Sequence, residues 1–225
     1  MKVLLLACQV FCLYCLYRYE LTLRAYEAGA ALSWRNPWMP YPLLRCLLIA
    51  SCAHVALFQA NIPYLYHWYA LLEGPVIALR FAAVLEVSYR QTWRFPLWGR
   101  LTGACFMLAT GYAASVWSVA IGDPLSTFVA VRRYPQIWSA SFFIVLEAFW
   151  VCRGDWKGRL SDWVAALYGV ICCNHGVIAV IGLTHGWTAH SWGSAMYLSW
   201  GIDALVWAVL AVVFRAGWRE VKSHP

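Results

Sequence analysis

The chain has 225 residues, of which 63% are hydrophobic and only 12% are charged, about half the charged share of a soluble domain. A water-soluble core of this size cannot bury so much apolar surface, so the composition excludes an ordinary soluble domain and requires lipid around the protein. The formal net charge of +7 does not indicate nucleic-acid binding, because the basic residues lie at the ends of apolar stretches and form no continuous basic run.

Seven apolar stretches are long enough to cross the hydrocarbon of a bilayer, which takes about 17 to 25 helical residues. The first begins beside Met1 and has no small-residue cleavage site, so we expect a retained helix and not a signal peptide. Pro75, next to Gly74, predicts a kink in the third apolar stretch. The predicted spans are 3–19, 43–62, 64–88, 101–121, 136–152, 162–183 and 192–214. We therefore expect one all-α domain over residues 1–225, a bundle of seven transmembrane helices.

The distribution of positive charge predicts how this bundle is oriented. Thirteen of the 17 Lys and Arg residues fall in the connections on one side, three on the other, and Arg80 lies inside a span. Positively charged connections stay in the cytoplasm. The N-terminus is therefore predicted outside and the C-terminus in the cytoplasm.

Two segments carry a resemblance to a known group of proteins. Leu79-Arg80-Phe81-Ala82-Ala83-Val84-Leu85-Glu86-Val87-Ser88-Tyr89-Arg90, followed by Phe95-Pro96-Leu97, is similar to a segment of uncharacterised bacterial seven-helix integral membrane proteins. Tyr17-Arg18-Tyr19 resembles the end of the first helix in the same proteins. The resemblance implies a seven-helix fold and a multi-pass location in the bacterial inner membrane, and it brings no known activity.

Ionisable side chains inside the spans are the first candidates for function, because each costs about 2.5–3.5 kcal/mol to insert and therefore usually faces the bundle interior. With a rise of 1.5 Å per residue, they fall at roughly 13–24 Å depth, within the middle third of the membrane. We interpret them either as a proton or ion relay or ligand pocket, or as a charge network that fixes helix register. The predicted midplane network contains Glu73, Arg80, Glu147, Asp203, His54, Asn174 and His175.

Within that set, Arg80 has Glu73, Glu147 and Asp203 as candidate counter-ions. Glu86 lies four residues before Arg90, a spacing that favours an ion pair along one helix.

Two histidine patterns raise the question of a cofactor or metal. His54 and His175 lie at similar depth on different spans, as two axial ligands of one haem would. His67, His185 and His190 fall at the outer ends of three spans, where they would suit zinc or another divalent ion, or a wet interfacial position. No cofactor is predicted, and haem and metal binding are held as alternatives.

The sequence contains no HExxH and no GxxxxGK[ST], and span seven has no Schiff-base lysine for retinal. The absence of a catalytic motif favours a non-enzymatic protein: a sensor, adaptor or accessory subunit of a membrane complex. One alternative is a small transporter or proton-conducting protein that uses the midplane Glu, Arg and Asp residues. Another is a haem- or pigment-binding redox subunit. The expected partners are the lipid bilayer and either another membrane protein or a second copy of the chain, but not nucleic acid.

Overall fold

The structure is a computed structural model, and the residues that it describes are helical apart from short connections and contain no strand, which confirms the all-α class. Side chains at residues 27, 58–60, 179–185 and 189–194 fall outside the description. The described residues are 1–27, 40–60, 76, 79–80, 82–84, 86–87, 154, 156–185 and 189–223.

Four helices are described in full: α1 over Lys2–Glu27, α2 over Pro42–Ala60, α6 over Leu160–His185 and α7 over Ala189–Ser223. Within α1 and α7, Lys2–Tyr26 and Ala195–Ser223 are long and apolar enough to cross a membrane, by length and composition. In α2 the apolar part, Pro42–Leu57, is shorter. The predicted spans 101–121 and 136–152 lie outside the described residues, and 64–88 is described only at scattered positions.

The terminal helices continue beyond the apolar stretches that predicted them. α1 runs eight residues past position 19, to Glu27, and α7 runs nine past 214, to Ser223. In the extension of α1, Leu23 is buried and Thr22 Oγ1 donates to the carbonyl of Arg18 at 2.9 Å. Apolar composition marks only the part of a helix in hydrocarbon, whereas helical hydrogen bonding needs no apolar residue outside it.

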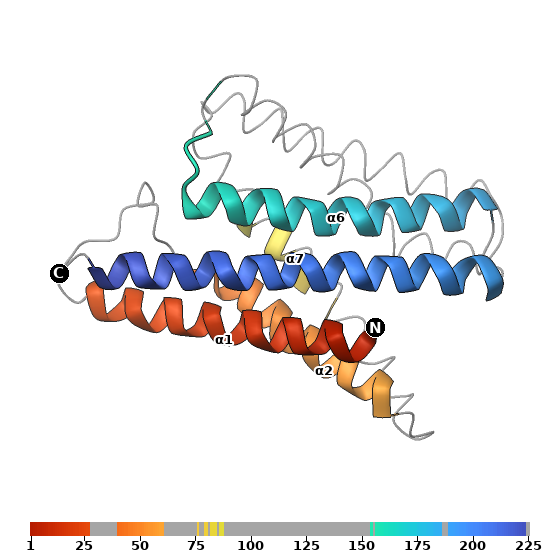
Figure 1. The fold of residues 1–225 in the computed structure, drawn as a ribbon, viewed down its shortest axis with the longest axis horizontal. Helices are drawn as coiled ribbons and strands as arrows, with labels where there is room; N and C mark the ends of the chain where they lie inside the picture. Colours follow the sequence, from red (N-terminus) through yellow and green to blue (C-terminus); the bar gives the residue numbers. More distant parts are fainter. Residues whose placement is uncertain are drawn as a thin grey trace.

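The directions of the helices follow from contacts at their two ends. Lys2 Nζ lies 4.5 Å from the centre of the Trp200 ring, and Arg18 Cζ lies 4.7 Å from that of Trp218, so α1 and α7 run parallel. Gly217 of α7 lies against Leu160 at the start of α6, so α6 runs antiparallel to α7. α2 packs on α1 in the opposite direction, and the ribbon follows the same course (Figure 1).

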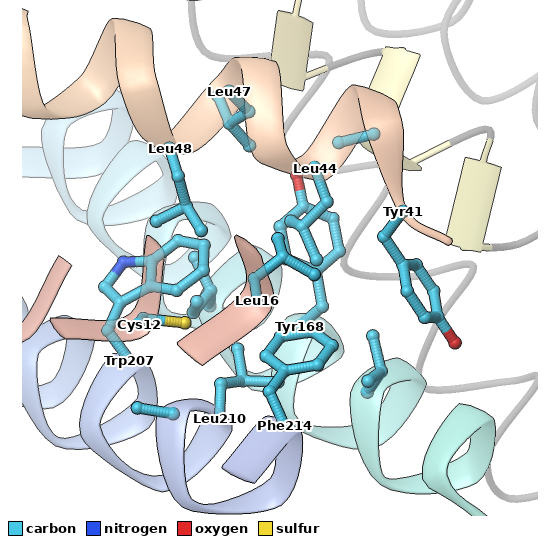
Figure 2. Packing of buried hydrophobic residues seen from close by; sticks show 14 of the residues in the cluster. Cys12, Leu16, Tyr41, Leu44, Leu47, Leu48, Tyr168, Trp207, Leu210 and Phe214 are labelled. Carbon is cyan, nitrogen blue, oxygen red and sulfur yellow. The ribbon is translucent and has the colours of Figure 1, made fainter. Parts of the chain in front are cut away.

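Buried aromatic and aliphatic side chains from all four helices form the core (Figure 2). Phe214 of α7 lies at its centre, with its ring centroid 6.0 Å from that of Tyr19 and 5.9 Å from that of Tyr41. Tyr168 contributes from α6 and Leu48 from α2. Gly217 lets α7 approach closely, because a Cβ atom there would contact Leu160 Cδ1 and lie 3.4 Å from Tyr19.

The outer faces of α1, α6 and α7 are apolar, while their inner faces hold polar residues. Each helix carries an exposed apolar stripe at seven-residue spacing, which we call the apolar stripes: Val3, Val10 and Tyr17; Trp163, Val170 and Val177; Leu198, Leu205 and Val212. Leu198 is 67% exposed and Val212 60%, whereas Asp203 on the same helix is 6% exposed. This is the reverse of a water-soluble helix bundle, in which the polar residues lie outside.

Candidate functional site

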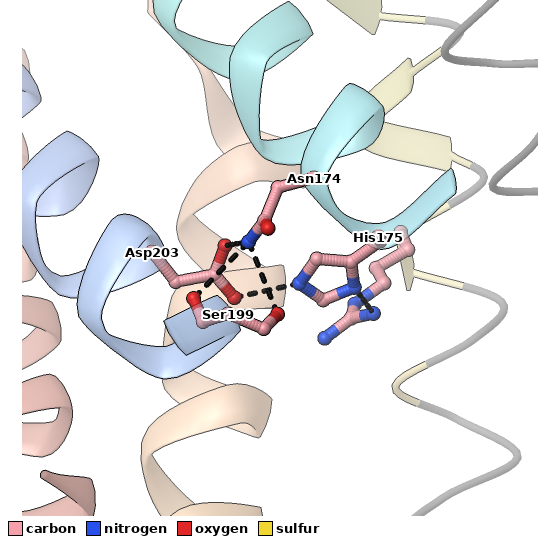
Figure 3. Close-up of polar contacts among 5 residues, drawn as sticks. Asn174, His175, Ser199 and Asp203 are labelled. Atoms are coloured by element: carbon pink, nitrogen blue, oxygen red, sulfur yellow. Dashed lines mark hydrogen bonds and ion pairs between the residues drawn. The ribbon is translucent and has the colours of Figure 1, made fainter. Parts of the chain in front are cut away.

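The most concentrated polar group in the described structure lies between α6 and α7. Asn174 and His175 are consecutive on α6, and Ser199 and Asp203 are four residues apart on one face of α7. His175 and Asp203 each lie within about 5 Å of the midpoint of their helices, at 1.5 Å per residue. Antiparallel packing therefore brings the two middles into contact, and the side chains meet there (Figure 3).

Both oxygens of the Asp203 carboxylate accept hydrogen bonds from α6. Asn174 Nδ2 donates to Oδ1 at 2.8 Å, and His175 Nε2 lies 2.6 Å from Oδ2. The Asn174 amide is also 3.1 Å from both the carbonyl and the hydroxyl oxygen of Ser199. Asp203 is 6% exposed and His175 is 8% exposed. A buried carboxylate with two side-chain donors satisfies the requirement that buried charges be hydrogen-bonded.

The other ring nitrogen of the histidine contacts Arg80. The Arg80 guanidinium nitrogen Nη1 lies 2.6 Å from His175 Nδ1. A guanidinium can only donate, so Nδ1 must carry a lone pair. The geometry therefore assigns His175 as the neutral tautomer with its proton on Nε2, where it donates to Asp203. The chain of groups runs from a cation through a neutral ring to an anion, which we call the Arg80–His175–Asp203 relay.

Arg80 is itself held in place by α6. The Tyr168 hydroxyl donates to the Arg80 backbone carbonyl at 3.3 Å. Tyr168 lies nearly two helical turns before His175 on α6. The relay joins three parts of the chain far apart in sequence, and its formal charges cancel. Asp203, one of the three candidate counter-ions of Arg80, is thus connected to it through His175.

The structure describes only some of the predicted midplane residues. It brings together Arg80, Asn174, His175 and Asp203, whereas Glu73 and Glu147 lie outside the described residues. His54 is half-buried on α2, which packs on α1. The predicted network of seven residues therefore stays a prediction.

The cofactor and metal hypotheses also stay predictions. A haem ligand needs a free ring nitrogen, and His175 would have to give up Arg80 or Asp203 to provide one. His67 and the side chains of His185 and His190 lie outside the described residues. In the parts of the chain that are described, no group of three or more His, Cys, Asp or Glu side chains is placed to hold a metal ion.

Sequence reasoning missed a second polar site, at the start of α2. Glu20 forms an ion pair with Arg45 and accepts from the Tyr41 backbone N–H at 2.8 Å. Glu86 accepts from the N–H groups of Leu43 at 3.4 Å and Leu44 at 3.0 Å.

These two carboxylates satisfy the orphan donors at the helix N-terminus and interact favourably with its dipole. The signal was Pro42, which marks a helix start, preceded by Tyr41, which has no capping oxygen of the Ser, Thr, Asp or Asn kind. The expected partner of Glu86, Arg90, lies outside the described residues.

Comparisons with models of known protein families, with characterised proteins and with solved structures find no match for this chain. Its function must therefore be argued from the residues described above.

Proposed function

We propose that the chain is a multi-pass membrane protein of seven helices in which the Arg80–His175–Asp203 relay conducts protons, as a small transporter or proton-conducting protein. The observation that carries the proposal is the buried histidine held between an acid and a guanidinium at the middle of two apolar helices.

The directions of the described helices support seven crossings. α1 and α7 run parallel, and α2 and α6 each run opposite to the helix on which they pack. If all four cross the membrane, α2 and α6 cross it in the same direction. The chain between residues 60 and 160 must then cross an odd number of times. The three spans predicted there, 64–88, 101–121 and 136–152, meet this condition.

The polarity of the described helices supports lipid as their surroundings. The apolar stripes are exposed over three helices, and ionised side chains lie inside. Exposure of Leu and Val side chains to water is unfavourable in free energy, whereas contact with lipid chains removes them from water. Ionisable groups within membrane helices normally face the bundle interior and mark ion or proton pathways.

The relay can exchange a proton because of the tautomer that its contacts fix. A proton added to His175 would go to Nδ1, the nitrogen that accepts from Arg80, and the ring would become a cation next to Asp203. Two donors would then face each other between His175 and Arg80, so the guanidinium has to move away. Proton uptake at the histidine is thereby coupled to movement of the Arg80 guanidinium, the kind of coupling that a proton-driven cycle needs.

Two other interpretations make different predictions. A purely structural relay would fix the register of α6 against α7 and conduct nothing. The sensor, adaptor or accessory-subunit hypothesis is supported only by the absence of catalytic motifs from the sequence. Proton conduction is supported by the contacts of the relay, which are made by described residues. We therefore place proton conduction first.

The test is proton flux into vesicles that contain the purified protein and an internal pH dye, driven by a potassium diffusion potential. We expect the wild type to acidify the lumen faster than empty vesicles, and Asp203→Asn and His175→Gln to fall to the empty-vesicle rate. Glu220→Gln, which neutralises an exposed acid on the same helix, should keep the wild-type rate.

All variants should elute as one species and unfold cooperatively, which separates loss of conduction from loss of fold. A wild-type rate equal to that of empty vesicles would overturn the proposal. So would an Asp203→Asn protein that conducts like the wild type.

A further inference from the structure

The parallel ends of α1 and α7 carry a group of exposed basic side chains. Arg18 lies beside Trp218 across the two helices, and the buried residue Tyr19 packs near Gly217, so these helix ends lie side by side. In Figure 1 they meet near the C-terminus. The group, which we call the basic end, consists of Arg18, Arg24, Arg215, Arg219 and Lys222.

These charges differ from two other basic residues near the same end, which form ion pairs. Arg45 forms an ion pair with Glu20, and Arg159 lies 3.6 Å from Asp162. None of the five residues of the basic end forms an ion pair with another described residue. Glu220 is the exposed acid among them, so five positive charges face one negative charge and leave the basic end with a net charge of +4.

The apolar stripes of the same two helices run directly into the basic end. On α7 the last exposed residue of the stripe, Val212, is three residues before Arg215, about 4.5 Å along the axis. On α1 the exposed ring of Tyr17 precedes Arg18. On each helix an exposed apolar residue of the stripe thus lies within one helical turn of an arginine of the basic end, and on α1 the exposed residues Leu21 and Tyr26 lie among the basic ones.

We propose that the basic end binds the phosphate headgroups of anionic phospholipids, with their acyl chains on the apolar stripes. This rests on the membrane location put forward above, but not on proton conduction. One lipid molecule has both halves of the required chemistry, an anionic head and an apolar tail of two chains. The Trp218 ring under Arg18 restricts the guanidinium, so it loses less freedom when it binds a phosphate.

An acidic protein segment would match the charge but not the adjoining surface. Such a partner would be bound by the arginines alone and would leave Val212 and Tyr17 facing outward. Each charge of a juxtamembrane basic cluster raises the affinity for anionic lipid about fivefold. The effect of neutralising three charges should therefore be easy to measure.

The test compares spin-labelled phosphatidylglycerol with spin-labelled phosphatidylcholine in vesicles that contain the full chain, at low ionic strength. The ratio of their association constants should exceed one for the wild type. It should fall about fivefold or more in Arg215→Gln/Arg219→Gln/Lys222→Gln, in which only Arg18 and Arg24 remain to give selectivity. The control Arg215→Lys/Arg219→Lys keeps the charges and should keep most of the selectivity.

High salt should reduce the wild-type ratio, because the interaction is between exposed charges. A wild-type ratio of one would overturn the proposal and would be expected if the basic end served an acidic protein. Full selectivity in the triple variant would overturn it as well.

Flotation of the vesicles in alkaline carbonate shows whether the lipid site alone is wrong or the proposed membrane location is wrong as well. A protein that floats with lipid but shows no selectivity refutes only the lipid site. A protein that does not float refutes both the lipid site and the membrane location.

Discussion

The substitution Asp203→Asn tests whether the relay holds α6 and α7 together. The carboxylate accepts from His175 at one oxygen and from Asn174 at the other. An amide of the same shape offers one oxygen and one NH2 group. Whichever way it is turned, one of the two contacts becomes donor against donor, and the negative charge opposite Arg80 is lost.

The contacts allow the cost to be estimated. A hydrogen bond to a charged group contributes about 1.5–3 kcal/mol, and single polar contacts between membrane helices average about 0.6 kcal/mol with a maximum near 1.7. The second range applies more closely here, and the loss of charge adds to it, so we expect about 2 kcal/mol. For a chain of this length about 1 kcal/mol shifts Tm by about 2–4 °C, which gives a fall of about 4–8 °C.

The assay is thermal unfolding of the purified protein in mild detergent, followed by circular dichroism. Glu220→Gln makes the same chemical change on the same helix at an exposed position and should leave Tm within about 1 °C of the wild type. If Asp203→Asn also left Tm unchanged, the carboxylate would not be in contact with α6. The relay would then be wrong as drawn.

Three further substitutions test other contacts by the same unfolding assay. Gly217→Val should cost about 1–3 kcal/mol because its Cβ meets Leu160, while Ala216→Val at the exposed neighbouring position should be nearly silent; equal effects would contradict the close approach. Glu86→Gln should cost about 1 kcal/mol, since it weakens two bonds to the first turn of α2, and no change would refute that cap. Ser199→Ala should cost under about 1 kcal/mol, because the Asn174 amide keeps its other acceptors; a larger loss would show that the hydroxyl does more than share one donor.

The position of the relay residues along their helices could be worked out from the sequence, but their pairing could not. That position depends only on the helical rise of 1.5 Å per residue and on where an apolar stretch begins. Pairing depends on how far each helix is rotated about its own axis, and the mostly apolar sequence around Asp203 and His175 leaves that rotation open. From the sequence, Glu73, Glu147 and Asp203 were therefore equally plausible counter-ions of Arg80. Nothing in the sequence was a reason to place a histidine between the charges.

The start of α2 illustrates a different limit. Pro42 is a local signal for a helix start, because its fixed backbone angle suits the first helical position. The groups that cap it, Glu20 and Glu86, lie 22 and 44 residues away along the chain. No local pattern links them to Pro42, because the cap is completed only when α1 and the segment around Glu86 pack against α2. In the same way, the apolar stretch 3–19 does not indicate where α1 ends, because Leu23 and the residues up to Glu27 extend the helix beyond it.

Nitrogen-15 NMR of labelled histidine in lipid bilayers would test the proton-exchanging relay most directly, with the His175→Gln variant used to assign the signal. At neutral pH the account predicts that His175 is neutral, with its proton on Nε2 and Nδ1 accepting from Arg80. When acidification protonates the ring, its signal should convert to that of the doubly protonated form, and the contact with Arg80 should be lost in the same step. A ring protonated on Nδ1 at neutral pH, or a doubly protonated ring that keeps its contact with Arg80, would contradict the account.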